Sequence, residues 1–292
     1  MMKSKPYNER RLYRNGNWIY LLDDDDRTAW IVKGHIGRSK RFRVPDRIDV
    51  DGHNYTITSI EMRAFNHPRT LRYLSIPDSI EYVDEDVFIF MPKLQSIHIG
   101  KGVKHLTDWH FRRGEGSTPL FIDKDNPNIK LSNNLLLTGD GKTVLRTMKY
   151  CRNYIIPEGV ERIYACAMWE NKILKEVTLP STLKVVGDNG LANNPKLKRL
   201  VFPEGFETFD VQGLMDNTEL EYLDLPSTLK KLTDSICGCT SLKTLIIRTN
   251  HVFDSPVEID GIPSDCKLLV PDCLVKEYEK HPLWSNFHVE SL

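Results

Sequence analysis

The chain has 292 residues, of which 40% are hydrophobic, 9% aromatic and 27% charged; this composition indicates a globular protein with a sizeable core and excludes a disordered or collagen-like chain. Forty Lys and Arg residues balance forty Asp and Glu residues, so no basic excess is available to neutralise phosphates. Nucleic acid and anionic membranes are therefore not expected partners.

The first residues, MMKSKPYNERRLYRNGNW, lack the apolar run of a secretory signal peptide. Further along, no stretch of about 18 apolar residues indicates a membrane span. We therefore expect neither a signal peptide in the given chain nor membrane insertion. Residues 1–54 are predicted to form an N-terminal strand cap, because the apolar segments Trp18–Leu22 and Trp30–Val32 flank a charged turn at Asp23–Asp26.

A repeat with a period of 23 residues is the main signal of the sequence, and it runs through residues 55–117 and 155–249. Prolines follow one another at steps of 23 from Pro157 to Pro226. Three apolar columns keep the same register. They are Leu71, Leu94, Leu174, Leu197, Leu220 and Leu242; Ile60, Val83, Leu106, Ile163, Val186, Phe209 and Leu232; and Phe65, Phe88, Phe111, Met168, Leu191, Leu214 and Ile236.

The row that begins at Leu174 shows what one repeat forms. Its first six residues, Leu174-x-x-Val177-x-Leu179, predict a short strand with one buried face, and Pro180 ends that strand because proline lacks a backbone donor. A second short strand is expected at Leu183–Val186, and Gly187–Asn194 is too short and polar for more than a helical turn. Each row is thus one coil of a solenoid that buries its apolar face against neighbouring coils.

The rows are interrupted at residues 118–154 and then resume in register. Two apolar segments, Leu135–Leu137 and Val144–Met148, flank Gly139-Asp140-Gly141, which predicts a hairpin that extends the solenoid wall. Residues 250–292 are predicted to form a C-terminal cap, with a last strand at Leu268–Val270, a short helix through Tyr278 and an apolar finish at Trp284 and Phe287. All five segments are expected to form one structural domain.

These rows resemble leucine-rich repeats of the BspA-like bacterial type. The resemblance is carried by L-x-x-[VIL]-x-[LIF]-P followed by the apolar columns, and by YTITSIEMRAFNHPRTLRYLSIP and IIPEGVERIYACAMWENKILKEVTLP. It implies a β-rich, leucine-rich-repeat (α/β-type) right-handed solenoid with stacked short parallel strands, capped ends and one hairpin-like insertion. It also implies a protein that is secreted or attached to the cell surface and acts in adhesion and interaction.

The polar positions of the opening strands are expected to line one face that binds a partner. Tyr and Arg are enriched at binding hot spots, so Tyr73, Arg199 and Tyr222 are the first candidates; the alternative is that all of these are ordinary solvated strand residues. The full set is Tyr73, Ser75, Ser96, His98, Glu176, Thr178, Arg199, Val201, Tyr222, Asp224, Thr244 and Ile246.

Catalytic and metal sites have weaker support. Gly141-Lys142-Thr143 resembles the end of a phosphate loop, but the first glycine of that motif is replaced by Leu136. The run 100–105, GKGVKH, lacks the last glycine of the dinucleotide pattern. We therefore expect no catalytic residue, cofactor or metal.

Three other groups of metal-ligating residue types have simpler explanations. Turn chemistry accounts for the possible calcium ligands Asp123, Asp125, Asn126 and Asn128, and the coil should separate His98, His105 and His110. The six cysteines are expected to be buried thiols. A catalytic set assembled from residues distant in sequence stays open.

The sequence therefore predicts a noncatalytic protein-protein interaction module that binds an unidentified protein along its strand face. The first alternative is a surface adhesin for a host glycoprotein or extracellular matrix. The second alternative is a carbohydrate-binding or enzymatic site beside the insertion, which would need a pocket with converging carboxylates and Trp or Tyr.

Overall fold

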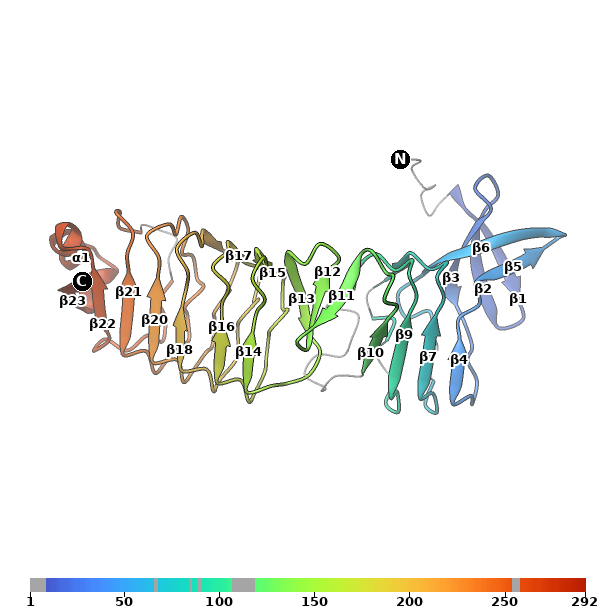
Figure 1. The fold of residues 1–292 in the computed structure, drawn as a ribbon, viewed down its shortest axis with the longest axis horizontal. Coiled ribbons are helices and arrows are strands. Elements are labelled where there is room, and N and C mark those ends of the chain that lie inside the picture. Colours follow the sequence, from blue (N-terminus) through green and yellow to red (C-terminus); the bar gives the residue numbers. More distant parts are fainter. Residues whose placement is uncertain (1–8, 66–67, 85, 89–90, 107–118, 254–257) are drawn as a thin grey trace. The chain divides into compact units, whose positions relative to one another are not determined.

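The computed structural model describes residues 9–65, 68–84, 86–88, 91–106, 119–253 and 258–292. The chain divides into two compact units: unit 1 comprises residues 1–131 and 138–140, and unit 2 comprises residues 132–137 and 141–292. Both units are built from solenoid coils that stack short parallel strands, which confirms the predicted fold (Figure 1). Phe111 and His110 lie outside the described residues.

Unit 1 begins with the predicted strand cap. Its first three strands are antiparallel neighbours in the order β1-β2-β3, and the predicted charged turn connects the second to the third. The Asp23 carboxylate fixes this turn, because its Oδ1 accepts the backbone N–H groups of Asp25 and Asp26 at 3.0 and 3.2 Å. The strands are β1 (Arg11–Asn15), β2 (Trp18–Asp23) and β3 (Thr28–Lys33).

The same sheet continues into the first repeats. β6 (His53–Ile60) pairs in parallel with β3 on one side and with β8 (Tyr82–Val83) on the other, and β5 (Arg47–Val50) pairs with β6 in antiparallel orientation. Ile31, Ile60 and Val83 occupy neighbouring register positions and are buried. The second apolar column is therefore core, as predicted.

A second sheet of unit 1 is fully parallel, in the order β10-β9-β7-β4. Two of its strands, β7 (Tyr73–Ile76) and β9 (Ser96–Ile99), follow the 23-residue period. The outer strands β4 (Arg41–Arg43) and β10 (Leu120–Ile122) were not predicted. Gly100 follows β9 where other rows have proline, and a Cβ at Gly100 would come within 2.7 Å of the backbone of Pro77 and Asp78.

The predicted hairpin has most of its two strands in unit 2 and its turn, residues 138–140, in unit 1. β12 (Leu135–Thr138) pairs antiparallel with β13 (Thr143–Thr147), so the sequence prediction is confirmed. β13 then pairs in parallel with β15 (Arg162–Ile163), which continues through β17 (Val185–Val186) to β19 (Thr208–Phe209). The insertion thus supplies a strand to the solenoid wall, as expected. β11 (Ile129–Ser132) precedes the hairpin.

The opening strands of unit 2 lie side by side (Figure 1). The first two of these strands, β14 and β16, pair in parallel with each other. The other five form a parallel sheet in the order β18-β20-β21-β22-β23. Their bounds are β14 (Asn153–Ile155), β16 (Glu176–Thr178), β18 (Arg199–Val201), β20 (Tyr222–Leu225), β21 (Thr244–Ile247), β22 (Lys267–Val270) and β23 (His288–Ser291).

The C-terminal cap has the predicted helix and apolar finish, with Tyr278, Trp284 and Phe287 buried. The helical segments are η3 (Asp272–Leu274), α1 (Val275–Lys280) and η4 (Trp284–Asn286). The prediction that Leu268–Val270 forms the last strand is wrong, because β23 follows the helix and pairs in parallel with β22. The chain returns to the sheet and adds one further rung.

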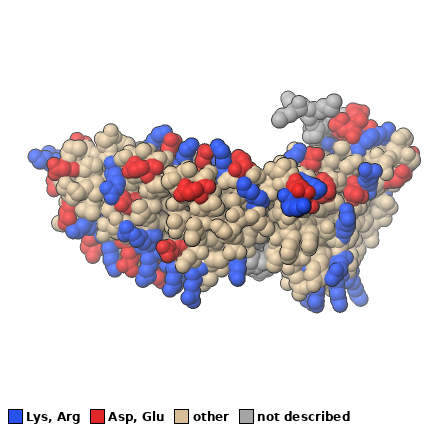
Figure 2. Space-filling view, in the orientation of Figure 1, with Lys and Arg blue, Asp and Glu red and all other residues tan. Residues whose placement is uncertain are grey.

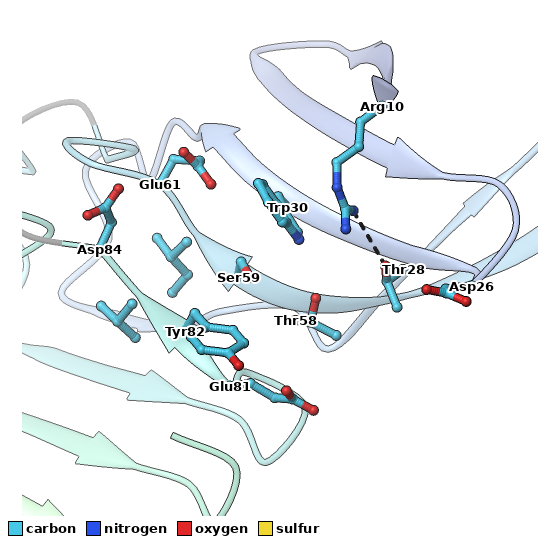
Figure 3. Close-up of a pocket in the computed structure, with 12 residues that line it drawn as sticks. Arg10, Asp26, Thr28, Trp30, Thr58, Ser59, Glu61, Glu81, Tyr82 and Asp84 are labelled. Carbon is cyan, nitrogen blue, oxygen red and sulfur yellow. Dashed lines mark hydrogen bonds between the residues drawn. The ribbon is translucent and has the colours of Figure 1, made fainter. Parts of the chain in front are cut away.

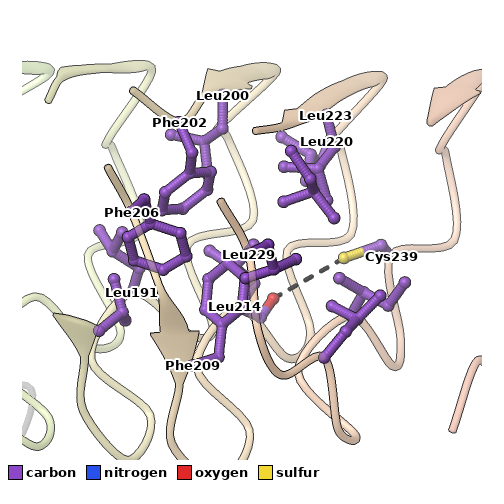
Figure 4. Packing of buried hydrophobic residues seen from close by; sticks show 14 of the residues in the cluster. Leu191, Leu200, Phe202, Phe206, Phe209, Leu214, Leu220, Leu223, Leu229 and Cys239 are labelled. Atoms are coloured by element: carbon purple, nitrogen blue, oxygen red, sulfur yellow. Dashed lines mark hydrogen bonds between the residues drawn. The ribbon is translucent and has the colours of Figure 1, made fainter. Parts of the chain in front are cut away.

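The core of unit 2 runs along the inside of the coils and includes the predicted columns. Phe202, Phe206 and Phe209 form a compact aromatic cluster within it, with ring centroids 4.4 to 5.0 Å apart (Figure 4). Leu191 and Leu214 from the third column have no exposed surface. Neighbouring coils thus bury the apolar residues that a single coil could not cover.

Candidate binding surfaces

The outward side chains of the opening strands in unit 2 form an open surface, here called face 2. Parallel register places Arg199 next to Tyr222 and Tyr222 next to Thr244, and Glu176 and Thr178 on β16 are exposed. The apolar side chains of Ile155 and Val201 are 66% and 46% exposed. Face 2 comprises Ile155, Glu176, Thr178, Arg199, Val201, Tyr222 and Thr244.

Two of the predicted hot-spot residues contact each other on face 2. The guanidinium carbon of Arg199 lies 3.6 Å from the centroid of the Tyr222 ring, which is a cation–π contact. The Tyr222 hydroxyl donates to Asp224 Oδ2 at 3.4 Å. These contacts hold a large aromatic ring and an arginine in place at the surface, which lowers the entropy lost when a partner binds.

Asp224 and Ile246 are buried, so the prediction that they line the exposed face is wrong for both. Arg248, which follows β21, covers Asp224 with two hydrogen bonds to its carboxylate, from Nε at 2.8 Å and from Nη2 at 2.9 Å. The Asp224 carboxylate in turn raises the pKa of Arg248. Ile246 lies between Asp224 and Leu269 in the register of the sheet and is only 5% exposed.

The corresponding surface of unit 1, here called face 1, lies on the sheet β4-β7-β9-β10. Tyr73 and Ser75 are half-buried, and His98 is exposed. Ser96 is buried, which corrects the prediction for that residue; its short side chain lies beside the larger Tyr73 in the register. Face 1 comprises Arg41, Arg43, Tyr73, Ser75, Ser96, His98 and Phe121.

Three residues of face 1 were missed by the sequence analysis. The Arg41 guanidinium carbon lies 4.6 Å from the centroid of the Tyr73 ring, and the rings of His98 and Phe121 stack with centroids 4.8 Å apart. Arg43 is next to Ser75 in register. The alternation of Arg41-Phe42-Arg43-Val44 and the short apolar run Leu120-Phe121-Ile122 were the available signals, but both segments fall outside the rows of the period.

Face 1 is hollowed at two adjoining places. One depression of about 350 Å³ is lined by Arg41, Arg43, Tyr73, Ser75 and His98, among others. The other, of about 260 Å³, shares Arg43, Ser75 and His98 and extends to Phe121 and Asp123. In unit 1, Lys and Arg side chains gather where β4, β7 and β9 begin (Figure 2). Face 1 therefore combines aromatic rings with positive charge.

The remaining candidate residues have structural roles. Asn126 is buried, donates to the Gly100 and Val103 carbonyls at 2.9 and 3.1 Å and accepts the N–H groups of Asn128 and Ile129. Turn chemistry thus accounts for these residues, as the sequence analysis expected. Within the described residues, no three His, Cys, Asp or Glu side chains converge as metal ligands.

Burial of the cysteines is only partly as predicted. Cys166, Cys237, Cys239 and Cys266 are buried free thiols. Cys273 is exposed and Cys151 half-buried, so the prediction is wrong for these two. Cys273 lies in the short η3 segment beside Leu274, whose side chain occupies the inward position.

A comparison with models of protein families identifies the family of this chain. The family model described as the BspA type leucine rich repeat region matches residues 50–133 and 144–255 in six copies, which is more than half of the chain. The chain belongs to the BspA-type leucine-rich repeat family. Proteins of this family are typically surface or secreted interaction modules, and the fold is generally not enzymatic.

Solved structures of bacterial leucine-rich repeat proteins share the fold. The pneumococcal vaccine antigen PcpA is 17% identical over 97% of this chain and 98% of its own, with a TM-score of 0.54. A leucine-rich repeat protein from Bacteroides ovatus is 16% identical over 96% of this chain and 76% of its own, with a TM-score of 0.53. One from Eubacterium ventriosum is 16% identical over 80% and 77%, with a TM-score of 0.50.

The comparison with curated proteins gave no match. At 16 to 17% identity the structural likeness shows the fold alone. Among the described residues, every helix of this BspA-type protein is too short or too polar to cross a bilayer.

Proposed function

We propose that this BspA-type protein binds a protein partner on the outward faces of its opening strands. The observation that carries the proposal is the stacked Arg199–Tyr222 pair on face 2, 3.6 Å apart and flanked by the exposed side chain of Val201. Arginine and tyrosine dominate binding hot spots, and an ordered ring loses little entropy on association. Ile155 extends the same surface with an apolar side chain that is 66% exposed.

Face 1 supports the same function with different chemistry. Its Arg41–Tyr73 and His98–Phe121 contacts place cationic and aromatic groups beside shallow depressions. Such a surface suits a partner that presents carboxylates beside apolar side chains, because complementary charge favours the correct encounter. The balanced net charge of the whole chain leaves this selectivity to the local surface.

The test uses three variants of the full chain, each checked for native circular dichroism and thermal unfolding. One carries Arg41→Glu and Tyr73→Ala on face 1, and another carries Arg199→Glu and Tyr222→Ala on face 2. The matched control carries Arg162→Glu and Tyr164→Ala, which lie on and beside β15 rather than on an opening strand.

Bacterial lysate and host matrix extracts are screened in parallel, and any captured protein is purified and its affinity measured. We expect the native chain and the control to bind equally, and one face variant to bind at least about tenfold more weakly. Equal affinity of all four proteins would refute the strand-face assignment. A partner drawn from the matrix extract would favour the adhesin alternative.

A further inference from the structure

Unit 1 contains a pocket of about 470 Å³ on its first sheet, which is a different sheet from face 1. Its walls come from β3, β6, β8 and the residues next to them, together with Arg10 (Figure 3). None of its lining residues comes from the insertion at residues 118–154, where the sequence analysis placed the alternative site. The pocket is lined by Arg10, Asp26, Thr28, Trp30, Thr58, Ser59, Ile60, Glu61, Glu81, Tyr82, Val83 and Asp84.

The strand register explains why a space exists there. Trp30 is next to Ser59, and Ser59 is next to Tyr82, on three parallel strands. Neighbouring strands are about 4.8 Å apart, so the outer two strands are about 10 Å apart with only a small hydroxymethyl group between them. A planar group needs about 3.5 to 4 Å to each ring for van der Waals contact. The small Ser59 thus leaves a slot between two aromatic side chains.

The pocket already holds one cation of this chain. The guanidinium carbon of Arg10 lies 3.9 Å from the centroid of the Trp30 ring, and its Nη1 donates to Thr28 Oγ1 at 3.4 Å. An arginine side chain is therefore compatible with the shape and chemistry of this wall. Tyr82, on the opposite wall, is 57% exposed and already contacts a second cation of the chain, because Lys104 Nζ lies 4.8 Å from its ring centroid and donates to its hydroxyl at 3.3 Å. An incoming guanidinium would take the place of this exposed lysine on the ring.

Carboxylates surround the slot. Glu81 is paired with Lys104 at 2.5 Å, but the half-buried carboxylate of Glu61 has no ion pair or hydrogen bond with any described residue. Burial and the nearby charge of Asp84 raise the pKa of Glu61, and the positive charge of Arg10 offsets this rise only in part. An incoming cation would relieve this unfavourable negative charge, whereas an anion would increase it.

We propose that this pocket binds an arginine side chain of a peptide or protein partner, with its guanidinium between Trp30 and Tyr82 and directed at Glu61. Arginine fits better than lysine, because its flat guanidinium stacks on aromatic faces and donates in a fork to a carboxylate. The proposal is independent of the strand faces.

The test is calorimetric titration of the full chain with acetyl-Gly-Arg-Gly-amide. The matched ligand is the same peptide with citrulline, which keeps the shape of arginine and removes its charge. Glu61→Gln and Tyr82→Ala are the test variants. Glu207→Gln is the control, because Glu207 is a surface carboxylate paired with Lys230 in unit 2.

We expect the arginine peptide to bind and the citrulline peptide to bind at least about tenfold more weakly. Glu61→Gln and Tyr82→Ala should each weaken binding of the arginine peptide by about tenfold, and the control substitution should leave its affinity unchanged. Because Tyr82 is exposed, its variant tests the site even if Glu61→Gln folds poorly. No binding, equal binding of the two peptides, or binding of maltose in place of the arginine peptide would overturn the proposal.

Discussion

The backbone N–H of Asn194 donates a hydrogen bond of 2.9 Å to Oδ1 of Asn217, which lies 23 residues later in the chain. The same bond, at the same length, joins Asn171 to Asn194. Each of the two later asparagines also donates from Nδ2 to two backbone carbonyls of the coils it connects. Cys239 continues the row with a contact of 3.7 Å from its thiol to the Leu214 carbonyl (Figure 4). A side chain repeated once per coil thereby links consecutive coils in the buried interior.

Asn194→Ala should strongly destabilise unit 2. The variant leaves the N–H of Asn171 and the carbonyl of Met168 without these partners in a buried site, whereas the Leu191 carbonyl keeps its bond from Asn217. Each lost partner costs about 1–3 kcal/mol, so we expect the free energy of unfolding to fall by about 2 kcal/mol or more in urea titrations. Asn153→Ala, at an exposed position, is the control. A loss no larger than that of the control would show that the asparagine row does not stabilise the coils.

Phe209→Ala should open a cavity in the aromatic cluster. Phe209 has no exposed surface, and its ring centroid lies 5.0 Å from that of Phe202 and 4.8 Å from that of Phe206. Truncation of a buried phenylalanine typically costs about 3–5 kcal/mol, and we expect a loss in this range by chemical denaturation. Phe121→Ala removes a side chain that is 52% exposed and should cost much less. Equal losses for the two variants would contradict the assigned core.

The repeated coils could be predicted because each coil buries apolar side chains at equivalent positions. Leu191 and Leu214 are 23 residues apart and occupy equivalent buried positions in successive coils, so the period alone locates the core. The hairpin β12–β13 was also predictable, because glycines separate two apolar segments. The period did not reveal that Asn194 bonds both of its neighbours, because that chemistry depends on the side chain turning inward.

The pocket and the extra strands depend on contacts that do not follow the period. β4 pairs with β7 although Arg41 and Tyr73 are 32 residues apart, and β23 reaches β22 only after a helix. The pairing that places Trp30 beside Ser59 includes a register shift between Ala29 and Trp30. A shift of one residue exchanges the two faces of a strand, so the sequence could not show which aromatic residues would meet.

Raising the pH should destabilise the protein at pH values below those at which its lysines lose their charge. Burial raises the pKa of Cys239 and of Cys266 from 9.0 to about 12. The unfolded chain therefore releases these protons first, so stability is intact below about pH 9 and falls as the pH rises toward about 12. Tyr20 and Tyr278, whose pKa values burial raises to about 12, add to the fall above about pH 10.

Urea titrations between about pH 8 and pH 10.5 measure this effect. Each thiol should contribute up to about 1.4 kcal/mol per pH unit above pH 9. Cys239→Ala should show a shallower decline than the native chain, and Cys273→Ala, which removes an exposed thiol, should show the native slope. A stability that does not change over this range would contradict the burial of the thiols.

The buried pair of Arg10 and Asp23 allows a test of whether charge or packing dominates its contribution to stability. The sign of the stability change caused by a second substitution gives the answer. Arg10 Nη2 lies 3.5 Å from Asp23 Oδ2, and the two side chains are 1% and 0% exposed. Arg10→Met removes one charge and leaves the other buried, which costs about 3–5 kcal/mol. Asp23→Asn added to that variant removes the remaining charge and keeps an oxygen to accept the turn N–H groups of Asp25 and Asp26. The double variant should therefore be more stable than Arg10→Met alone in urea titrations. If the second substitution destabilises further, the loss in Arg10→Met comes from packing on Trp30 rather than from the uncompensated charge.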